Sequence, residues 1–142
     1  MNTFFESKVK FEKIDEQSGK TKKVTEKYIF EAVSYTDAET KIYEEMEKYI
    51  NGEFNITSIT KPNYSEVLST FTGSIWYKGK IKFESFDTET SKSKKVSNNI
   101  LVMADNVDDA YNNINEAYAD MTVDFTIEGI TDSKVIEFFK MD

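Results

Sequence analysis

The feature that most constrains this chain is an internal repeat. The segment KTKKV at residues 20–24 recurs as KSKKV at residues 92–96, seventy-two positions later. Further segments align at the same or a nearly equal offset: KVKFE (8–12) with KIKFE (80–84), and GEFNITSIT (52–60) with VDFTIEGIT (123–131). Because both order and spacing are kept, we interpret the chain as a tandem duplication. We predict a single domain of two repeats, repeat one at residues 1–71 and repeat two at residues 72–142.

Each repeat reads as two strands, a helix and a third strand. Residues 4–14 alternate between apolar and polar side chains, with the period of a half-buried strand. Residues 15–20 are polar and contain Gly19, which predicts a turn, and residues 22–33 form the returning strand of a β-hairpin. Residues 53–60 return as the third strand.

The helix of repeat one is predicted over residues 36–49. Thr36 and Glu39 have the spacing of a capping box, Gly52 follows the helix, and four apolar side chains share one helical stripe. These are Ala38, Ile42, Met46 and Tyr49. A short amphipathic helix or turn then ends each repeat, at residues 62–71 and 132–141.

The repeat is therefore ββαβ(α), and the predicted fold class is α+β. A right-handed crossover would place the helix on one face of a mixed sheet. We expect one or two such sheets, with the helices on one face and the repeats related by a pseudo-twofold axis.

Composition excludes most catalytic chemistry. The chain has no cysteine, histidine or arginine, which removes thiol nucleophiles, imidazole bases and guanidinium clamps. An acidic cluster at residues 105–109, with Asp120 and Asp124, has the oxygen ligands that Mg²⁺ or Ca²⁺ prefers, but helix capping explains the same aspartates. We predict that the protein is not an enzyme and has no cofactor or metal.

Basic residues are concentrated in two segments of an acidic chain. The formal net charge is -8, yet residues 8–27 and residues 78–95 each carry a net charge of +3. Within each segment, strand parity places several lysines on the face away from the predicted core, together with apolar side chains. In repeat one these are Lys8, Lys10, Lys23 and Lys27, with Phe4, Ile14 and Ile29; in repeat two they are Lys78, Lys80, Lys82 and Lys95, with Trp76, Phe86 and Leu101.

Lysines among aromatic side chains on an open sheet are typical of proteins that bind single-stranded nucleic acid. The alternatives are a solvated face whose charge prevents edge-to-edge aggregation, and aromatics buried between the repeats or in an oligomer. The candidate phosphate-binding residues are Lys8, Lys10, Lys22, Lys23, Lys80, Lys82, Lys94 and Lys95, and the candidate stacking residues are Trp76 and Phe4.

Two long stretches carry a family resemblance. FFESKVKFEKIDEQSGKTKKVTEKYIFEAVSYTDAETKIYEEM and the later WYKGKIKFESFD resemble a family of short uncharacterised proteins, a domain of unknown function of gut Bacteroidales and related phages. The resemblance covers nearly the whole chain and implies no catalytic residue. The arginine-free, lysine-rich composition is similar to that of a phage-encoded member.

Two functional hypotheses follow. The first is a non-enzymatic protein that binds single-stranded DNA or RNA as an accessory to replication, repair or transcription. The second is a protein-interaction module, either a virion or assembly component or an inhibitor of a host protein, that uses the acidic surface or the exposed aromatic side chains. No apolar run is long enough to span a membrane and no signal peptide is readable, so we expect a cytoplasmic location.

Overall fold

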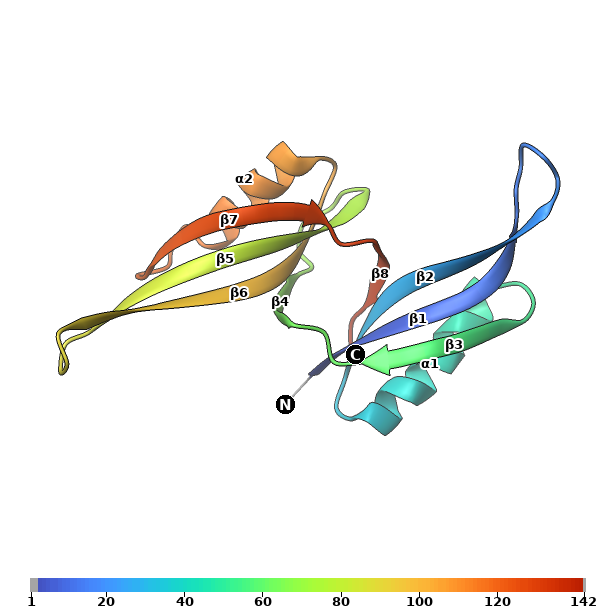
Figure 1. The fold of residues 1–142 in the computed structure, drawn as a ribbon, viewed down its shortest axis with the longest axis horizontal. Coiled ribbons are helices and arrows are strands. Elements are labelled where there is room, and N and C mark those ends of the chain that lie inside the picture. Colours follow the sequence, from blue (N-terminus) through green and yellow to red (C-terminus); the bar gives the residue numbers. More distant parts are fainter. Residues whose placement is uncertain (1–2, 142) are drawn as a thin grey trace. The chain divides into compact units, whose positions relative to one another are not determined.

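The computed structural model of the chain describes residues 3–141, which form two compact units. Unit 1 takes the chain up to Pro62 and again from Val135, and unit 2 is Asn63–Lys134 (Figure 1). Unit 1 contains β1 (Thr3–Ile14), β2 (Thr21–Ala32), α1 (Tyr35–Tyr49), β3 (Phe54–Thr60) and β8 (Val135–Phe139). Unit 2 contains β4 (Tyr64–Leu68), β5 (Ile75–Asp87), β6 (Lys92–Ala104), α2 (Val107–Ala117) and β7 (Asp124–Asp132). The fold is α+β and mostly strand, with two mixed sheets.

The two sheets have the same strand arrangement. Their orders are β3-β1-β2-β8 and β7-β5-β6-β4. In each, a long antiparallel hairpin is flanked by an antiparallel strand on one side and a short parallel strand on the other. The short strand comes from the other half of the chain: β4 follows β3 but pairs with β6, and β8 follows β7 but pairs with β2. Each sheet is therefore completed by a strand exchanged within the chain.

This exchange corrects the prediction of a short helix or turn at the end of each repeat. YSEVL and VIEFF are strands, β4 and β8, although their apolar spacing also fits one or two helical turns. Tyr, Val, Ile and Phe favour strands, and the open edges of β2 and β6 give these segments a pairing partner. The units consequently do not coincide with residues 1–71 and 72–142, because β4 pairs with β6 in unit 2 and β8 pairs with β2 in unit 1.

Irregularities in the ladders also fall at matching places. The pairing of β1 with β3 shifts register between Lys8 and Val9, and that of β5 with β7 shifts between Lys80 and Ile81, seventy-two positions on. A bulge adds a residue to one strand and increases the local twist. Bulges in the same place bend the two sheets in the same way.

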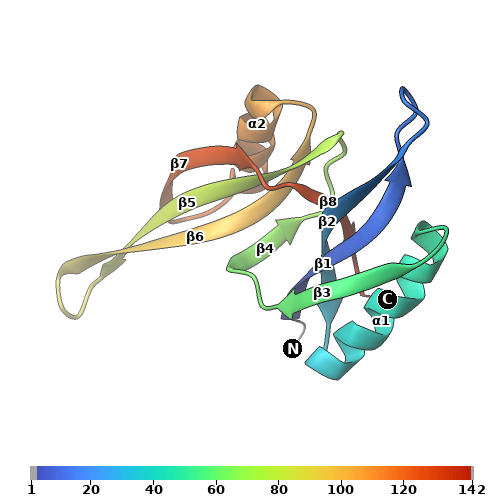
Figure 2. The same cartoon turned by 45° about the vertical axis from the view of Figure 1, so that its right-hand side comes forward.

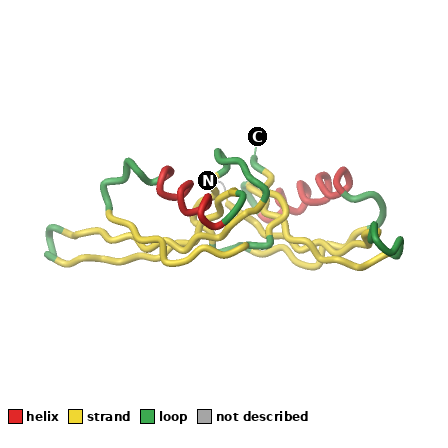
Figure 3. Tube along the Cα trace, turned by 90° about the horizontal axis from the view of Figure 1, so that it is seen from above, coloured by secondary structure: helices red, strands yellow, loops and turns green. Residues whose placement is uncertain are grey.

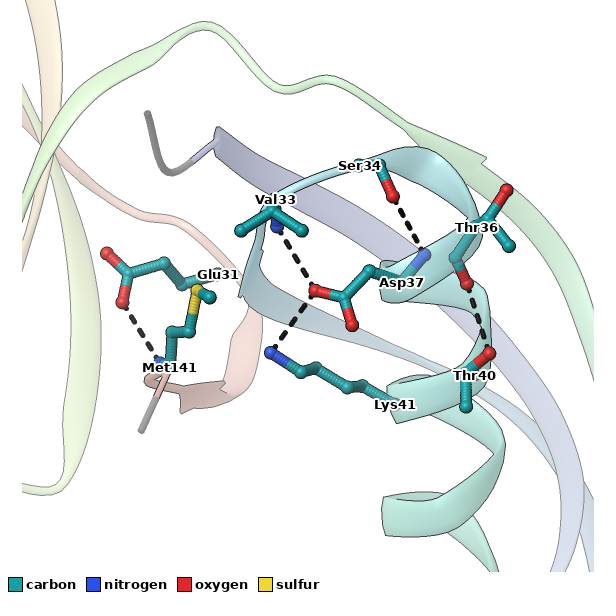
Figure 4. Close-up of polar contacts among 8 residues, drawn as sticks. All are labelled: Glu31, Val33, Ser34, Thr36, Asp37, Thr40, Lys41 and Met141. Atoms are coloured by element: carbon teal, nitrogen blue, oxygen red, sulfur yellow. Dashed lines mark hydrogen bonds and ion pairs between the residues drawn. The ribbon is translucent and has the colours of Figure 1, made fainter.

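Both helices begin with a reciprocal capping box, shown for α1 in Figure 4. The Ser34 hydroxyl accepts from the Asp37 backbone N–H at 3.1 Å, and the Asp37 carboxylate accepts from the Val33 N–H at 3.1 Å. At the start of α2 the Asn106 side chain accepts from the Asp109 backbone N–H at 2.8 Å, and the Asp109 carboxylate accepts from the Asp105 N–H at 3.0 Å. Such a cap contributes about 1 kcal/mol.

The predicted box of Thr36 and Glu39 was wrong by two residues. Ser34 has the extended backbone of a cap, with φ -154°, whereas Thr36 lies inside the helix and its carbonyl accepts from the Thr40 hydroxyl. The physical reason is that Ser34 can satisfy a free N–H of the first turn and Thr36 cannot.

One face of each sheet is covered by the helix of its own unit, as Figures 2 and 3 show. In unit 1 the predicted stripe of Ala38, Ile42 and Met46 is fully buried, but Tyr49 is 53% exposed and lies at the end of the helix. The core between α1 and its sheet includes Val9, Tyr28, Phe30, Ile42 and Met46; that under α2 includes Tyr77, Ile81, Ile100, Val102 and Ile114. The opposite face of each sheet is the one on which lysines were expected.

Candidate functional site

The two basic segments form long β-ribbons, here called the first arm (residues 8–27) and the second arm (residues 78–95). The first arm carries seven lysines against four acidic residues, and the second six against three. The flanking strand ends opposite Phe11 in the first arm and opposite Glu84 in the second, so each arm is only two-stranded toward its turn (Figure 1). Side chains there are exposed on both faces of the ribbon.

Strand register places four lysines of the first arm on the face away from α1. Lys8 lies directly opposite Lys27, and Lys10 and Lys23 follow on the same face. Lys8, Lys10 and Lys23 are exposed, while Lys27 is half-buried with its Nζ 3.8 Å from Glu6. Two like charges directly opposite each other are unfavourable, and binding of an anion would relieve this.

The second arm repeats this row. Lys78, Lys80 and Lys82 alternate along β5, and Lys95 of β6 lies opposite Glu84 on the same face. Lys78, Lys80 and Lys95 are exposed and Lys82 is half-buried. Within residues 3–141, none of the eight nominated lysines lies within 4.0 Å of a carboxylate oxygen. Their charges are available to an external anion.

Lys22 and Lys94 do not belong to these rows. Lys22 pairs with Lys13 and Lys94 with Ser85, which places both on the helix-side face of their arms. The sequence pattern predicted one basic patch at Lys22 and Lys23 and a second at Lys94 and Lys95. Neighbouring residues of a strand point to opposite faces, so each patch divides between two surfaces.

The predicted stacking residues are not presented as expected. Trp76 is on the lysine face but is only 5% exposed, and Ile29 and Leu101 of the same faces are fully buried. Phe4 is half-buried and its ring contacts Phe138 edge-on, with centroids 6.0 Å apart. Strand alternation therefore predicted the correct face for these side chains but not their solvent exposure. Part of each face is packed, and the lysine face is exposed to solvent along the arm.

Two apolar side chains that were not nominated are strongly exposed. Ile14 is 68% exposed at the end of β1, and Phe86 is 64% exposed near the end of β5. They are seventy-two positions apart and lie on the lysine faces of their arms. Their parity was readable from the sequence, but parity did not separate them from the buried Ile29 and Leu101.

The aspartates at residues 105–109 serve the start of α2. The Asp109 backbone N–H donates to the Asn106 side chain, and the Asp109 carboxylate accepts from the Asp105 backbone N–H. Within residues 3–141 no three acidic side chains converge as a metal site would require. Burial and a hydrogen bond to Glu26 raise the pKa of Tyr28, and burial and a hydrogen bond to Glu66 raise the pKa of Tyr118.

A hollow of about 380 Å³ lies in unit 1 between α1 and the residues after β8. Phe30 and Phe139 form its apolar wall, and Lys41 and Glu45 lie on the helix side. Lys41 is paired with Asp37 at 3.4 Å, and Glu31 accepts from the Met141 N–H (Figure 4). Lys41 and Asp37 thus interact at the start of α1, and Glu31 binds the backbone just after β8.

These features define a class: an α+β protein of two like units, each completed by an exchanged strand and each carrying a basic β-ribbon. The chain belongs to the family described as Domain of unknown function (DUF4494), whose model matches residues 3–141. No curated protein and no solved structure matches the chain. Neither α1 nor α2, the helices of residues 3–141, is long and apolar enough to cross a membrane.

Proposed function

We propose that the protein is a non-enzymatic binding protein whose two arms engage single-stranded nucleic acid, as an accessory to replication, repair or transcription. The observation that carries the proposal is the row of exposed lysines on the same face of both arms. Within residues 3–141 none of them has a carboxylate oxygen within 4.0 Å; they are Lys8, Lys10, Lys23, Lys78, Lys80 and Lys95. Lysines of this kind bind phosphates and release counterions from the nucleic acid. The acidic remainder of the chain discourages binding elsewhere on the surface.

The proposal includes a tandem duplication from which both arms derive, so the two arms are expected to bind in the same way. Tandem duplication is supported by the repeated segments, the matching capping boxes and the matching bulges. Two copies of one basic ribbon give two attachment points for a strand, and linked sites bind more tightly than either does alone.

The test is fluorescence anisotropy of a labelled single-stranded DNA of about thirty nucleotides, titrated at several salt concentrations. Each phosphate contact contributes about 0.7 to the slope of log affinity against log salt concentration. We expect the double reversal Lys23→Glu/Lys95→Glu to weaken binding and to reduce this slope by about one to two.

The neighbouring pair supplies a matched control. Lys22→Glu/Lys94→Glu changes the net charge equally, in the same arms, on the opposite face. It should therefore weaken binding clearly less. Equal losses from both doubles would show only a general charge effect, and no binding by the unaltered protein at low salt would end the proposal.

The second candidate is a protein-interaction module, either a virion or assembly component or an inhibitor of a host protein. The observation that favours it is α1, where Tyr35, Tyr43 and Tyr49 are each about half exposed on a helix that also carries exposed glutamates. Aromatic side chains with surrounding acidic charge suit a basic protein surface. Co-purification with and without nuclease separates the two, because a protein partner would survive nuclease treatment.

We also propose that the protein is phage-encoded and acts in the host cytoplasm. The support is the lysine-rich composition without arginine and the family resemblance. Finding genes for this family beside phage structural or replication genes would support the origin, whereas an exclusively chromosomal setting would contradict it.

A further inference from the structure

We infer that Phe86 and Ile14, at the ends of the two arms, are the base-contacting residues of the nucleic-acid site. The inference rests on the proposed function and deepens it. It assigns phosphates to the lysine rows and bases to the two apolar side chains, with Phe86 stacking on a base and Ile14 making an apolar contact. The partner is a single strand whose bases are unpaired and reachable.

Exposure is the first observation. Phe86 and Ile14 are the two most exposed large apolar side chains of the described chain, at 64% and 68%. Soluble proteins leave single apolar side chains exposed without consequence, so exposure alone decides nothing. What distinguishes these two is that the repeat places an apolar side chain at the same point of both arms, seventy-two positions apart.

The second observation is their position relative to the lysines. Ile14 lies opposite Thr21, and Lys23 is the next residue of β2 on the same face. Phe86 lies opposite Ser93, with Lys95 in the corresponding place. A diagonal neighbour in an antiparallel pair is about 7–8 Å away, so an ammonium group and an apolar side chain meet one nucleotide together. Lysine on phosphate beside an aromatic on a base is the usual arrangement for a single strand.

The third observation is that the Phe86 ring has no aromatic neighbour within residues 3–141. The flanking strand β7 reaches only Glu84, and within residues 3–141 no aromatic ring contacts Phe86, while Phe83 packs on Tyr118 and Phe125. Trp76, by contrast, is buried and unavailable to a base. The stacking role predicted for Trp76 therefore moves along the same face of β5 to Phe86.

The aspartates in the turns of the two arms are compatible with base contacts at Phe86 and Ile14. Asp15 accepts from the Gln17 N–H at 3.0 Å, and Asp87 accepts from the Glu89 N–H at 2.9 Å, so both shape their turns. Their charge repels phosphates from the extreme tip. A strand held by the lysine rows would then present bases, and not phosphates, to the arm ends.

The experiment combines affinity with a local optical signal. Phe86→Ala should weaken binding of the labelled single-stranded DNA about tenfold, and Ile14→Ala about threefold, while the salt slope stays unchanged. The control is Val96→Ala, an exposed apolar residue of β6 directly after the second arm and on the opposite face, which should leave affinity unchanged. Phe86→Trp should keep affinity and add a tip fluorophore that is quenched on binding, whereas Trp76, the single natural tryptophan, should respond little.

The outcomes separate the two proposals. Salt-dependent binding that is lost in Lys23→Glu/Lys95→Glu, but unaffected by Phe86→Ala and without quenching of Phe86→Trp, would overturn the base contact and leave the proposed function standing. Absence of salt-dependent binding would overturn both. Equal weakening by Phe86→Ala and Val96→Ala would also overturn the assignment, because the loss would then not depend on the lysine face.

Discussion

Units 1 and 2 share a framework but stabilise it with different side chains. The strand order, the capping boxes and the bulges coincide, whereas the aromatic clusters do not. In unit 1 the rings gather at the exchanged strand, where Phe139 stacks on Phe30 with centroids 4.6 Å apart. In unit 2 they gather near the base of the arm, where Phe83, Tyr118 and Phe125 meet. The backbone plan is thus compatible with more than one core.

The exchanged strand is held to the helix in both units by a tyrosine and a glutamate. Tyr49, at the end of α1, donates to Glu137 of β8 at 3.4 Å, and Tyr118, the cap of α2, donates to Glu66 of β4 at 2.9 Å. The two glutamates hold the same position in β4 and β8, whereas the two tyrosines differ in position because α1 has 15 residues and α2 has 11. Both units thus have a tyrosine–glutamate hydrogen bond between the end of the helix and the exchanged strand, but the tyrosine comes from a different helix position in each.

The largest expected effect comes from removing β8 by ending the chain at Lys134. Unit 1 would lose the Phe139 ring from Phe30 and the parallel ladder along β2. β8 contributes the buried Val135 and the partly buried Phe138 and Phe139. Loss of one large buried side chain costs about 3–5 kcal/mol, so we expect a reduction of this size in the free energy of unfolding of unit 1. Urea denaturation with hydrogen exchange should show faster exchange at Lys27–Phe30 of β2.

The comparison between units supplies the controls for this truncation. Amides of β6 pair with β4, which the truncation leaves intact, so their protection should persist if the units unfold separately. Phe86→Ala, at an exposed site, should change stability by less than about 0.5 kcal/mol. Unchanged protection in β2 would contradict the role given to the exchanged strand.

Local signals explain which parts of the fold were readable from the sequence. The long hairpins, the helices and the third strands follow from alternation and helical stripes, which the local sequence determines. The exchange of β4 and β8 was missed because YSEVL and VIEFF do not reveal which strand they pair with. Ser34 was missed as a cap because SYTD and TDAE both place an acceptor three residues before an acidic side chain.

For the candidate site, the sequence predicted which face of the sheet each side chain occupies, but not whether that side chain is exposed to solvent. Alternation correctly put Lys8, Lys80 and Trp76 on the face away from the helices. It gave no information on which part of that face is packed, so Trp76 was taken as open although it is 5% exposed. Exposure depends on contacts between distant segments, and Phe86 could be distinguished from Trp76 only in the folded chain.

A smaller effect is expected at alkaline pH, through one buried tyrosine in each unit. Burial and a glutamate raise the pKa of Tyr28 and of Tyr118 above the ordinary value of about 10. The unfolded chain therefore loses these protons at lower pH than the folded chain does. The stabilisation is complete below pH about 10 and is lost as pH rises beyond it.

Denaturation midpoints measured between pH 8 and about 11 should show this loss. Tyr28→Phe and Tyr118→Phe should each make the decline shallower, whereas Tyr111→Phe, at an exposed site on α2, should not. Each variant differs from the unaltered protein at a single tyrosine, so only the differences between the declines are compared. Identical declines in all four proteins would contradict the burial of the two hydroxyl groups.

The smallest expected effect is at a position on the helix-side face of β1 and of β5, seventy-two residues apart in the sequence. Ser7 occupies it in unit 1, fully buried, and its hydroxyl has no hydrogen-bond partner within the described chain. Gly79 occupies it in unit 2, where an added Cβ would lie 2.9 Å from Ile114 Cδ1 and 3.3 Å from Ile100 Cγ1. Unit 1 thus has room for a side chain that unit 2 lacks.

Ser7→Ala removes a buried hydroxyl without a partner, and we expect it to stabilise unit 1 by up to about 1 kcal/mol, because the cost of desolvating that group disappears. Gly79→Ser introduces the reverse change and should destabilise unit 2 by about 1–3 kcal/mol, since the neighbouring isoleucines must move. Urea denaturation of the two variants measures both signs. If Gly79→Ser were as stable as the unaltered protein, α2 would have to yield at Ile114, and the difference between the units would be one of side-chain choice and not of space.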